Sequence, residues 1–309
     1  MNPHDQLVRD IGLFIDGFPA ILADEIAGTV VEVGPNVTVF QKGDRVFGQL
    51  ETKDKADGGG LQQFAILDAE FAAPLPKNVS ADQALTLPIN GIAAVFALFD
   101  SPGFGFPAPF PGFPSEAAGK AFDYSHKTLV IIGGGANSGK LGIQFARLAG
   151  FGRIIAIASV KNETELKSYG ATDVIDRHAS DVEIRRRVRS LADEVNYVYD
   201  VVSWKHNLAV SLLSDTKIGM VVTLHQVEID ESEFIGKEYK AIWILGSSHA
   251  RPELGKLFWK ALPGWFEEGK ITPLDFKVIP DGLNVEAVNN VLDDYRDGKN
   301  PGKWHVHPE

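Results

Sequence analysis

The stretch Lys127-Thr-Leu-Val-Ile-Ile-Gly-Gly-Gly-Ala-Asn-Ser-Gly-Lys-Leu-Gly-Ile-Gln-Phe-Ala-Arg147 decides the fold of this chain. A short apolar, β-branched run at 129–132 enters a cluster of glycines, and an amphipathic segment with Leu141, Phe145 and Leu148 at helical spacing follows. A strand, a glycine turn and a helix N-terminus form an anion site, because unpaired backbone N–H groups and the helix dipole point into the turn. We therefore predict that this turn holds a nucleotide phosphate.

The overall composition narrows the classes of protein to consider. At 309 residues the chain is comfortable for two domains, and 44% hydrophobic and 23% charged residues are ordinary globular values. The net charge of −11 argues against a nucleic-acid partner, because such a partner needs a basic face. The chain has no cysteine, which removes disulfides, thiol nucleophiles and cysteine-ligated zinc.

The sequence carries no signal for a membrane or for secretion. No apolar run approaches the length of a membrane span, and residues 1–6 lack the charged start and apolar region of a signal peptide. We therefore expect a cytoplasmic protein with no membrane partner.

Residues 1–75 have the pattern of strands and turns, without long helical periodicity. We expect strands here at 29–33, 37–40, 45–47 and 61–67. Ser80 is then predicted to cap an apolar helix that runs towards Phe99, and Pro88 is predicted to kink that helix or split it in two.

Residues 101–126 are unusual in composition, since their first half sets four phenylalanines among prolines and glycines. Proline and glycine exclude regular structure, and the phenylalanines are too many for a freely solvated linker. We interpret the segment as a surface loop pinned by its aromatic side chains. A lid over a substrate cleft and a polyproline ligand are the alternatives.

From residue 127 onward, apolar strands alternate with helices. Strands are expected at 129–132, 153–158, 172–175, 197–201, 220–224 and 241–245, and further helices at 161–169, 180–191 and 206–213. Near-continuous apolar strands between helices predict a parallel sheet covered on both faces. The remainder is expected to add helices at 254–269 and 285–296 and a strand at 304–306 that fits the sheet of the first domain.

Two phosphate-loop fingerprints overlap in the glycine turn. The run from Gly134 to Lys140 matches the start of a P-loop, but Leu141 stands where a serine or threonine must bind Mg²⁺, which disfavours an NTPase. The dinucleotide fingerprint reads Gly134-x-Ala136-x-x-Gly139, with alanine in place of the glycine that allows close approach of the pyrophosphate. Because a strand and a helix flank this fingerprint and a second strand follows, we favour a dinucleotide.

The end of the second strand selects the cofactor. In NAD-binding units an acidic side chain at this place accepts the ribose 2′-hydroxyl. This chain has Ser159, Lys161 and Asn162 there, and no carboxylate before Glu163. A carboxylate would repel a 2′-phosphate, whereas a hydroxyl and an ammonium would hold one. We therefore predict NADP(H); in the alternative, Lys161 only opens a solvated helix.

The order and spacing of several motifs resemble those of the medium-chain dehydrogenase/reductase superfamily across nearly the whole chain. They include Asn2-Pro-x-Asp5, the run from Pro19 to Gly34, Gly43-Asp44-Arg45-Val46, Gly60-x-x-Gln63-Phe64-Ala65, Leu87-Pro88 and Gly170-Ala171-Thr172-Asp173. The glycine-turn variant and the phenylalanine–proline insertion resemble the fungal zinc-independent enoyl-reductase or quinone-oxidoreductase-like branch. The resemblance implies an α/β fold, with a Rossmann doubly wound parallel sheet at 96–246 and a GroES-like, β-rich substrate domain at 1–95 and 247–309.

Two departures from the family pattern bear on function. Zinc alcohol dehydrogenases carry Gly-His-Glu where this chain has Ala23-Asp24-Glu25, so without cysteine we expect no catalytic or structural zinc and no simple alcohol dehydrogenation. Asp24 is interpreted as a structural acceptor rather than a general base. The family also has further strands ahead of the Asn-Pro segment, so we expect the GroES-like domain to be incomplete at its N-terminus, with a sheet edge that must be covered.

The resemblance also implies a set of cofactor-binding residues. Pyrophosphate contacts are expected from Gly134, Gly135, Ala136, Asn137, Ser138 and Gly139. The adenosine 2′-phosphate is expected at Ser159, Lys161 and Asn162, with Arg177 close to the adenosine. The nicotinamide side is expected to be approached by Val202, Leu224, His225, Leu245 and Ser247, and Lys303 belongs to the family's C-terminal Gly-Lys motif.

The function implied by the resemblance is NADPH-dependent, zinc-independent hydride transfer to a conjugated carbonyl: an enone, an enoyl thioester or a quinone. Without zinc, backbone N–H groups or hydroxyls must polarise that carbonyl. No proton donor stands out among Tyr124, His225 and Asn90, each of which also has a structural interpretation. The alternative is a non-catalytic NADPH-binding sensor or scaffold. The expected partner is a small-molecule substrate. The protein is expected to be a monomer or a homodimer, and a homodimer would pair through residues 241–245.

Overall fold

The computed structural model describes residues 1–51, 58–108, 122–299 and 302–308. The chain divides into two compact units. Unit 1 comprises Met1–Ile89 and Ser247–Glu309, and unit 2 comprises Asn90–Gly246.

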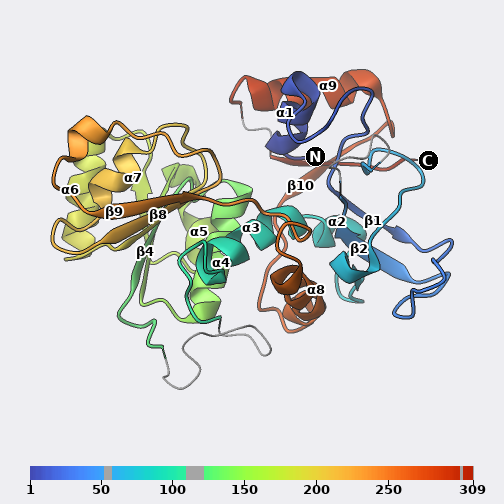
Figure 1. Ribbon diagram of the computed structural model, residues 1–309, viewed down its shortest axis with the longest axis horizontal. Helices are drawn as coiled ribbons and strands as arrows, with labels where there is room; N and C mark the ends of the chain where they lie inside the picture. The colour runs from blue at the N-terminus through green and yellow to red at the C-terminus, as the bar shows by residue number, and fades with distance from the viewer. Residues whose placement is uncertain (52–57, 109–121, 300–301, 309) are drawn as a thin grey trace. The chain divides into compact units, whose positions relative to one another are not determined.

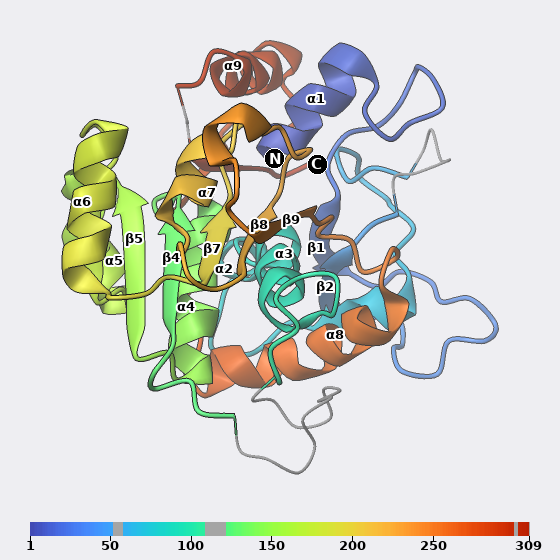
Figure 2. The ribbon, with the colours of Figure 1, turned by 60° about the vertical axis from the view of Figure 1, so that its left-hand side comes forward.

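Unit 2 is built on a six-stranded sheet in the order β6-β5-β4-β7-β8-β9, with every neighbouring pair parallel (Figures 1 and 2). The strands are β4 (Thr128–Ile132), β5 (Arg153–Ala158), β6 (Asp173–Asp176), β7 (Tyr197–Asp200), β8 (Gly219–Thr223) and β9 (Tyr239–Trp243). The chain moves outward from β4 in one direction and then returns to the other side of β4, which is the strand order of the Rossmann fold. The predicted doubly wound parallel sheet is therefore confirmed.

Helices cover both faces of this sheet. They are α4 (Asn137–Ala149), α5 (Glu163–Tyr169), α6 (Asp181–Leu191) and α7 (Asn207–Leu212), with short 3₁₀ turns η2 (Val160–Asn162) and η3 (Glu231–Phe234). Helix α4 packs beside α5 and α6 beside α7, as expected when right-handed crossovers place the two pairs on opposite faces of the sheet. On the α4 face, Gly142 lies so close to the sheet that a Cβ there would meet the Tyr199 ring at 3.1 Å.

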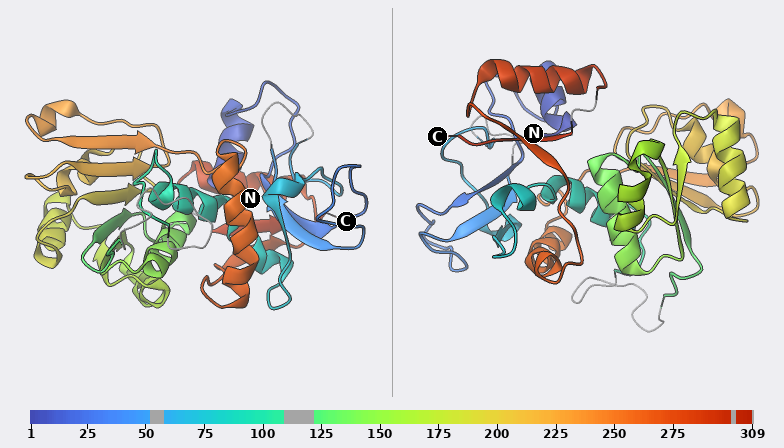
Figure 3. Two further views of the ribbon diagram at one scale, coloured as in Figure 1. Left: turned by 60° about the horizontal axis from the view of Figure 1, so that its bottom comes forward. Right: turned by 180° about the vertical axis from the view of Figure 1, so that it is seen from behind.

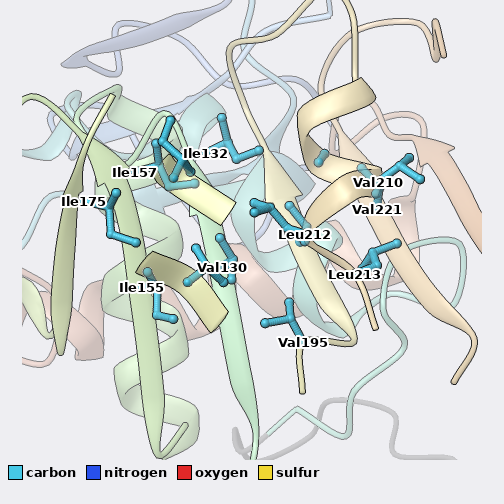
Figure 4. Close-up of a cluster of buried hydrophobic side chains, with 14 residues drawn as sticks. Val130, Ile132, Ile155, Ile157, Ile175, Val195, Val210, Leu212, Leu213 and Val221 are labelled. Atoms are coloured by element: carbon cyan, nitrogen blue, oxygen red, sulfur yellow. The ribbon is translucent and has the colours of Figure 1, made fainter. Parts of the chain in front are cut away.

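The core on the opposite face joins the strands to α6 and α7. Alternate strand residues such as Val130, Ile132 and Ile155 point into one cluster of buried aliphatic side chains (Figure 4). The helices contribute residues such as Ile184 and Val210, which are fully or almost fully buried. Each such side chain contributes about 1.5–3 kcal/mol when it is removed from water, so this face holds the strand order in place.

The described residues of unit 1 form two small sheets and four helices. The strands are β1 (Glu25–Thr29), β2 (Arg45–Gln49) and β3 (Ala72–Pro74) in one antiparallel sheet, and β10 (Phe276–Ile279) with β11 (Lys303–Val306) in a parallel pair. The helices are α1 (Pro3–Ile11), α2 (Ala81–Ala84), α8 (Pro252–Glu267) and α9 (Val285–Arg296), and η1 (Ala69–Phe71) is a 3₁₀ turn. Helices α1 and α9 lie side by side (Figures 1 and 3). The antiparallel strands agree with the β-rich character predicted for this part of the chain.

The expectations for residues 1–75 were partly wrong. Helix α1 forms where strands and turns were expected, because Pro3 opens the helix and the side chain of Asp5 accepts the backbone N–H of Asn2 at 2.6 Å. The β-branched run at 29–33 contributes only Thr29 to a strand, because the pairing with β2 spans Glu25–Thr29. The runs at 37–40 and 61–67 consist of bends and irregular backbone, and β3 was not predicted. Local β propensity at these places was overridden by tertiary pairing.

The apolar helix after Ser80 is split at proline, as predicted. The Ser80 side chain caps α2 by accepting the backbone N–H of Gln83 at 3.1 Å, and Pro88 begins α3 (Pro88–Phe99). Within the described residues, the segment Ala81–Phe99 has the length and composition of a membrane span, but 72% of its apolar window is buried inside the fold. That burial is the behaviour of a core helix.

The phenylalanine-rich segment is anchored at its described ends. The rings of Phe106 and Tyr197 lie 4.7 Å apart, and those of Phe122 and Tyr124 lie 4.6 Å apart, both edge to face. Phe106 is 4% exposed, so this aromatic side chain pins the segment to unit 2. Residues 109–121, on which the predictions of a lid or a polyproline ligand depend, lie outside the described residues.

Later elements match the predictions within a few residues. The predicted strand at 153–158 and the predicted helix at 285–296 have the bounds of β5 and α9. The strand expected at 241–245 begins two residues earlier, as β9. Strand β10 was missed, because its alternation is only four residues long. The predicted strand at 304–306 becomes β11, and it pairs with β10 rather than with the antiparallel sheet.

Candidate dinucleotide site

The glycine turn after β4 is shaped by its pairing with β5. The backbone N–H groups of Gly133 and Gly134 both donate to the carbonyl oxygen of Ile157, at 3.0 and 3.1 Å. Gly133 has φ +83°, a left-handed conformation that favours glycine. The turn therefore leaves the sheet tightly and enters α4 three residues later.

Three further glycines have no room for a side chain. A Cβ on Gly134 would lie 2.8 Å from Cβ of Ala156, and a Cβ on Gly135 would lie 2.7 Å from Nδ2 of Asn162. A Cβ on Gly139 would lie 2.2 Å from the carbonyl oxygen of Gly133. These contacts hold the helix close to the strand, so backbone atoms rather than side chains line the turn.

The N-terminus of α4 opens without a side-chain cap. Ala136 is the N-cap residue, with φ −75° and ψ 158°, and no side chain caps the helix. The N–H groups of Asn137 and Ser138 belong to the first turn, where a helix has no acceptors of its own. Ser138 Oγ donates to Oδ1 of Asn90 at 3.0 Å, so that hydroxyl is turned to α3. An uncapped helix N-terminus beside a glycine turn is an arrangement suited to a phosphate.

The structure gives no support to the P-loop alternative. The ammonium of Lys140 pairs with the Glu165 carboxylate at 2.6 Å, and the lysine side chain is only 12% exposed. Leu141 is fully buried. The lysine of a P-loop must instead reach the phosphates.

The predicted adenosine-side residues gather where β5 and β6 end. Ser159 follows β5 directly, and its hydroxyl accepts the backbone N–H of Lys161 at 3.4 Å. Arg177 follows β6, and its backbone N–H donates to the Ala158 carbonyl oxygen at 2.9 Å. Asn162 reaches the glycine turn through the contact with Gly135 described above. Two adjacent strands therefore bring these residues to one corner of the sheet.

Two of these residues are exposed cations. No carboxylate among the described residues lies within 4.0 Å of the Lys161 ammonium or the Arg177 guanidinium. By contrast, Lys167 on the neighbouring helix pairs with Glu163 at 2.7 Å. The nearest acid in sequence to Arg177 is Asp176, whose side chain accepts the backbone N–H of His178 at 3.1 Å. The corner thus presents positive charge to solvent.

On the other side of β4, Val202 lies against the glycine turn. A Cβ on Gly133 would meet Val202 Cγ1 at 2.5 Å, which places the ends of β4 and β7 in contact at the point where the strand order reverses. Asp200 ends β7, is fully buried, and accepts the backbone N–H groups of Val202 and Ser203 at 3.3 and 3.0 Å. Burial raises the pKa of Asp200. Ligands of open α/β sheets bind at such a switch point.

His225 follows β8 near this carboxylate. Its ring lies 4.3 Å from the ring of Trp204, and its buried Nδ1 has no hydrogen-bond partner among the described residues. Burial lowers the pKa of His225, against the attraction of Asp200. His225 is therefore neutral near pH 7. A second histidine, His206, is fully buried and bonded through Nε2 to Thr223 Oγ1 at 2.8 Å.

The remaining predicted residues are spread over both units. The Leu224 carbonyl accepts the Trp243 indole N–H at 3.1 Å, Leu245 is 39% exposed, and the Ser247 hydroxyl accepts the Ala250 N–H at 3.3 Å. Lys303 is 1% exposed in unit 1, where its ammonium contacts the Glu25 carboxylate and donates to Asn2 Oδ1 at 2.9 Å. The structure thus gives Lys303 a buried ion pair.

Two of the proton-donor candidates have structural partners. The Tyr124 hydroxyl donates to the Pro107 carbonyl oxygen, and burial raises the pKa of this phenol. Asn90 accepts the hydrogen bond from Ser138. A phenol that is buried and already donating is a poor proton source.

Sequence reasoning missed one pair of side chains in unit 1. His4 lies in the first turn of α1, and its Nδ1 is 2.7 Å from Oδ2 of Asp24. The histidine falls on the variable position of the Asn-Pro-x-Asp motif, so the motif itself carried no signal for it. The structure adds Asp5, whose Oδ1 accepts the Ala23 N–H at 2.8 Å.

His4, Asp5 and Asp24 offer ligand atoms within 4.8 Å of one another, the spacing of a metal site. However, both oxygens of Asp5 already accept backbone N–H groups, from Asn2 and Ala23. The 2.7 Å between His4 and Asp24 is also shorter than the roughly 3.4 Å between two ligands of a tetrahedral ion with bonds near 2.1 Å. The geometry fits a direct ion pair better than a metal centre.

Two family models match the chain. One, described as an alcohol dehydrogenase GroES-like domain, matches residues 1–77. The other, described as a zinc-binding dehydrogenase, matches residues 139–252. The first match lies within unit 1, and the second lies mostly within unit 2.

Similar proteins occur in fungi. The dehydrogenase orsE of Emericella nidulans is 32% identical over 228 residues, which are 71% of this chain. The aligned part spans 65% of orsE, which is less than two thirds of its length. The trans-enoyl reductase FMN2 of Fusarium mangiferae is 27% identical in an alignment that covers 100% of this chain and 89% of FMN2.

Solved structures share the fold. The mycobacterial protein Rv1454c, solved as a complex with NADPH, superposes with a TM-score of 0.74 at 20% identity, over 97% of this chain and 86% of that one. The two family models, the fungal trans-enoyl reductase and this shared fold all agree with the observed strand order and glycine turn. The chain is an enoyl-reductase-like member of the medium-chain dehydrogenase/reductase superfamily of oxidoreductases.

Proposed function

We propose that this protein is an NADPH-dependent, zinc-independent oxidoreductase that reduces a conjugated carbonyl, either an enone, an enoyl thioester or a quinone. The observation that carries the proposal is the glycine turn with its uncapped helix, set next to two exposed cations at the ends of β5 and β6. A nicotinamide dinucleotide fits this arrangement of donors. When bound, the cofactor supplies the hydride.

In this proposal each part of the turn has a separate task. The backbone N–H groups of residues 134–139 and the dipole of α4 hold the pyrophosphate, because no side chain intrudes on them. The Ser159 hydroxyl, the Lys161 ammonium and Asn162 hold the 2′-phosphate, and Arg177 adds a second cation. Val202, Leu224, His225, Leu245 and Ser247 are proposed to line the nicotinamide side.

Zinc independence is proposed from the donor set. The chain contains no cysteine, and Asp24 replaces the histidine of zinc alcohol dehydrogenases. The close contact between His4 and Asp24 also leaves too little space for an ion between them. Carbonyl polarisation must then come from the protein's own hydrogen-bond donors.

The substrate class is proposed from the relative named a trans-enoyl reductase, which aligns with this whole chain. The test is oxidation of NADPH by the purified protein with three acceptors: an unsaturated ketone, a crotonyl thioester and a benzoquinone. We expect turnover with at least one acceptor, and no change in rate after dialysis against a metal chelator. Tight NADPH binding without turnover on any acceptor would instead support a sensor or scaffold, and a chelator-sensitive rate would refute zinc independence.

A homodimer is proposed through β9, which forms one edge of the six-stranded sheet. Edge strands expose unpaired N–H and C=O groups, and a second copy can pair with them. Light scattering at micromolar concentration checks this, and a monomer at all concentrations would refute it.

A further inference from the structure

The lysine that completes the P-loop-like run has no task in the proposed cofactor site. Lys140 is the fourth residue of α4, and its backbone N–H donates to the Ala136 carbonyl oxygen at 2.8 Å. Its ammonium lies 2.6 Å from the carboxylate of Glu165, and the two side chains are only 12% and 29% exposed. Water therefore screens this pair less than it screens a pair at the open surface. A P-loop lysine binds a phosphate, whereas Lys140 binds an acid.

The Glu165 carboxylate is fixed between two helices of unit 2. Glu165 belongs to the first turn of α5, and α5 lies beside α4 (Figure 1). The hydroxyl of Tyr169, a residue that is 7% exposed, donates to Oε1 of Glu165 at 3.1 Å. The Lys140 ammonium contacts the same oxygen. Two donors on one oxygen hold the carboxylate next to the first turn of α4, so its charge cannot move away into solvent.

The residues just before α5 are the ones proposed to hold the 2′-phosphate. Lys161 and Asn162 lie in η2, which ends where α5 begins, so Glu165 is less than one helical turn beyond Asn162. Asn162 in turn approaches the glycine turn at Gly135. Glu165 thus lies near both phosphate-binding parts of the proposed site. Without its lysine, this acid would repel each of the two phosphate groups.

The other acid in the first turn of α5 is placed differently. Glu163 pairs with Lys167 at 2.7 Å, but these side chains are 44% and 50% exposed. Solvent and salt screen such a charge well. Glu165 is therefore the acid whose neutralisation matters for an anionic ligand.

We propose that Lys140 keeps the cofactor site attractive to phosphates by neutralising the Glu165 carboxylate. This inference rests on the proposed function, in which the glycine turn holds the pyrophosphate and residues 159–162 hold the 2′-phosphate. The hydrogen bond from Tyr169 cannot do the same, because a neutral donor leaves the net charge in place. Lys140 therefore acts through Glu165, and it raises the affinity for NADPH without touching the cofactor. NADH, which lacks the 2′-phosphate, gains less.

The test is calorimetric titration of the full chain with NADPH and with NADH, at low salt. Lys140→Met should weaken NADPH binding about tenfold and NADH binding less, because it uncovers one negative charge. Lys140→Arg keeps the cation and should bind NADPH within about threefold of the wild type. Glu165→Gln removes the acid and should bind NADPH as well as the wild type or more tightly. Adding Glu165→Gln to Lys140→Met should therefore restore the NADPH affinity.

Lys217→Met is the matched control. Lys217 pairs with Glu194, and these two residues precede β8 and β7, at the opposite edge of the same sheet. The substitution makes the same change of charge in another lysine–glutamate pair, so NADPH affinity should stay at the wild-type value. The loss in Lys140→Met should also shrink as salt is added, because salt screens the uncovered charge.

The inference is overturned if Glu165→Gln weakens NADPH binding as much as Lys140→Met does, since that is the result for a pair that only fastens α5 to α4. It is equally overturned if Lys140→Met binds NADPH like the wild type. If Lys140→Met does not fold, the double variant decides, because only a neutralising role predicts that it binds NADPH normally. Equal wild-type affinity for NADPH and NADH would refute the proposed NADPH preference, and the same variants would still decide the role of Lys140. A wild type that binds neither cofactor overturns both proposals.

Discussion

Replacing Lys161 with glutamate tests the preference for NADPH. Lys161 is exposed and has no ion-pair partner among the described residues, so its ammonium is available to a phosphate. A hydrogen bond to a charged group contributes about 1.5–3 kcal/mol, which is about 10- to 150-fold in affinity. A carboxylate at this place adds repulsion of about 1 kcal/mol or more at 4 Å in water. We therefore expect Lys161→Glu to weaken NADPH binding by about two orders of magnitude.

NADH separates this effect from damage to the fold, because it lacks the 2′-phosphate. Its affinity should stay within about threefold, or rise, since a carboxylate there accepts the ribose 2′-hydroxyl. Lys167→Glu is the matched control. It makes the same charge change at the fifth residue of α5, where the lysine side chain is 50% exposed and paired with Glu163. Loss of that exposed pair costs only about 0.3–0.5 kcal/mol.

The assay is titration of each protein with NADPH and NADH by intrinsic fluorescence or calorimetry, at low and at physiological salt. The NADPH preference should shrink as salt rises, because the Debye length falls to about 8 Å at 0.15 M. Equal affinity of the wild type for the two cofactors would refute the assignment of the β5–β6 corner to the 2′-phosphate. So would a Lys161→Glu protein that loses both cofactors to the same extent.

Three further changes test other parts of the structure. Gly139→Ala places a Cβ 2.2 Å from a backbone carbonyl oxygen, so we expect a stability loss of about 1–3 kcal/mol in urea unfolding. NADPH binding should also weaken at least tenfold. Unchanged NADPH binding would show that the glycine turn does not bind the pyrophosphate. Lys303→Met leaves the Glu25 carboxylate buried without its cation, so the free energy of unfolding should fall by about 3–5 kcal/mol. Adding Glu25→Gln should recover most of that loss. A Lys303→Met protein as stable as the wild type would contradict the buried ion pair. The raised pKa of His4 contributes up to about 3 kcal/mol of stability, which is fully present below pH 6.5 and is lost as pH rises through about 9. The free energy of unfolding of Asp24→Asn should lack this pH dependence. The same pH dependence of unfolding in both proteins would rule out the His4–Asp24 interaction.

Much of unit 2 could be predicted because its signals are local. The apolar run into the glycine turn and the helix that begins near Ser180 each depend on neighbouring residues, and so do the Ser80 cap and the proline at 88 in unit 1. The same holds for the residues after β5, where the absence of an acid is visible in the sequence. Unit 1 was harder to predict, because its strands are short and take their register from partners far along the chain.

The sequence by itself determined the glycine turn, the alternation of strand and helix, and the identity of the groups that can meet a phosphate. Only the tertiary structure decided that Val202 lies against Gly133, and that Arg177 shares a corner with Ser159, because the strand order joins residues that are far apart in the chain. It also decided that His4 meets Asp24, a contact across 20 residues that no local pattern encodes. Local backbone preferences act over a few residues, whereas these contacts arise from burial of the sheets and helices that carry them.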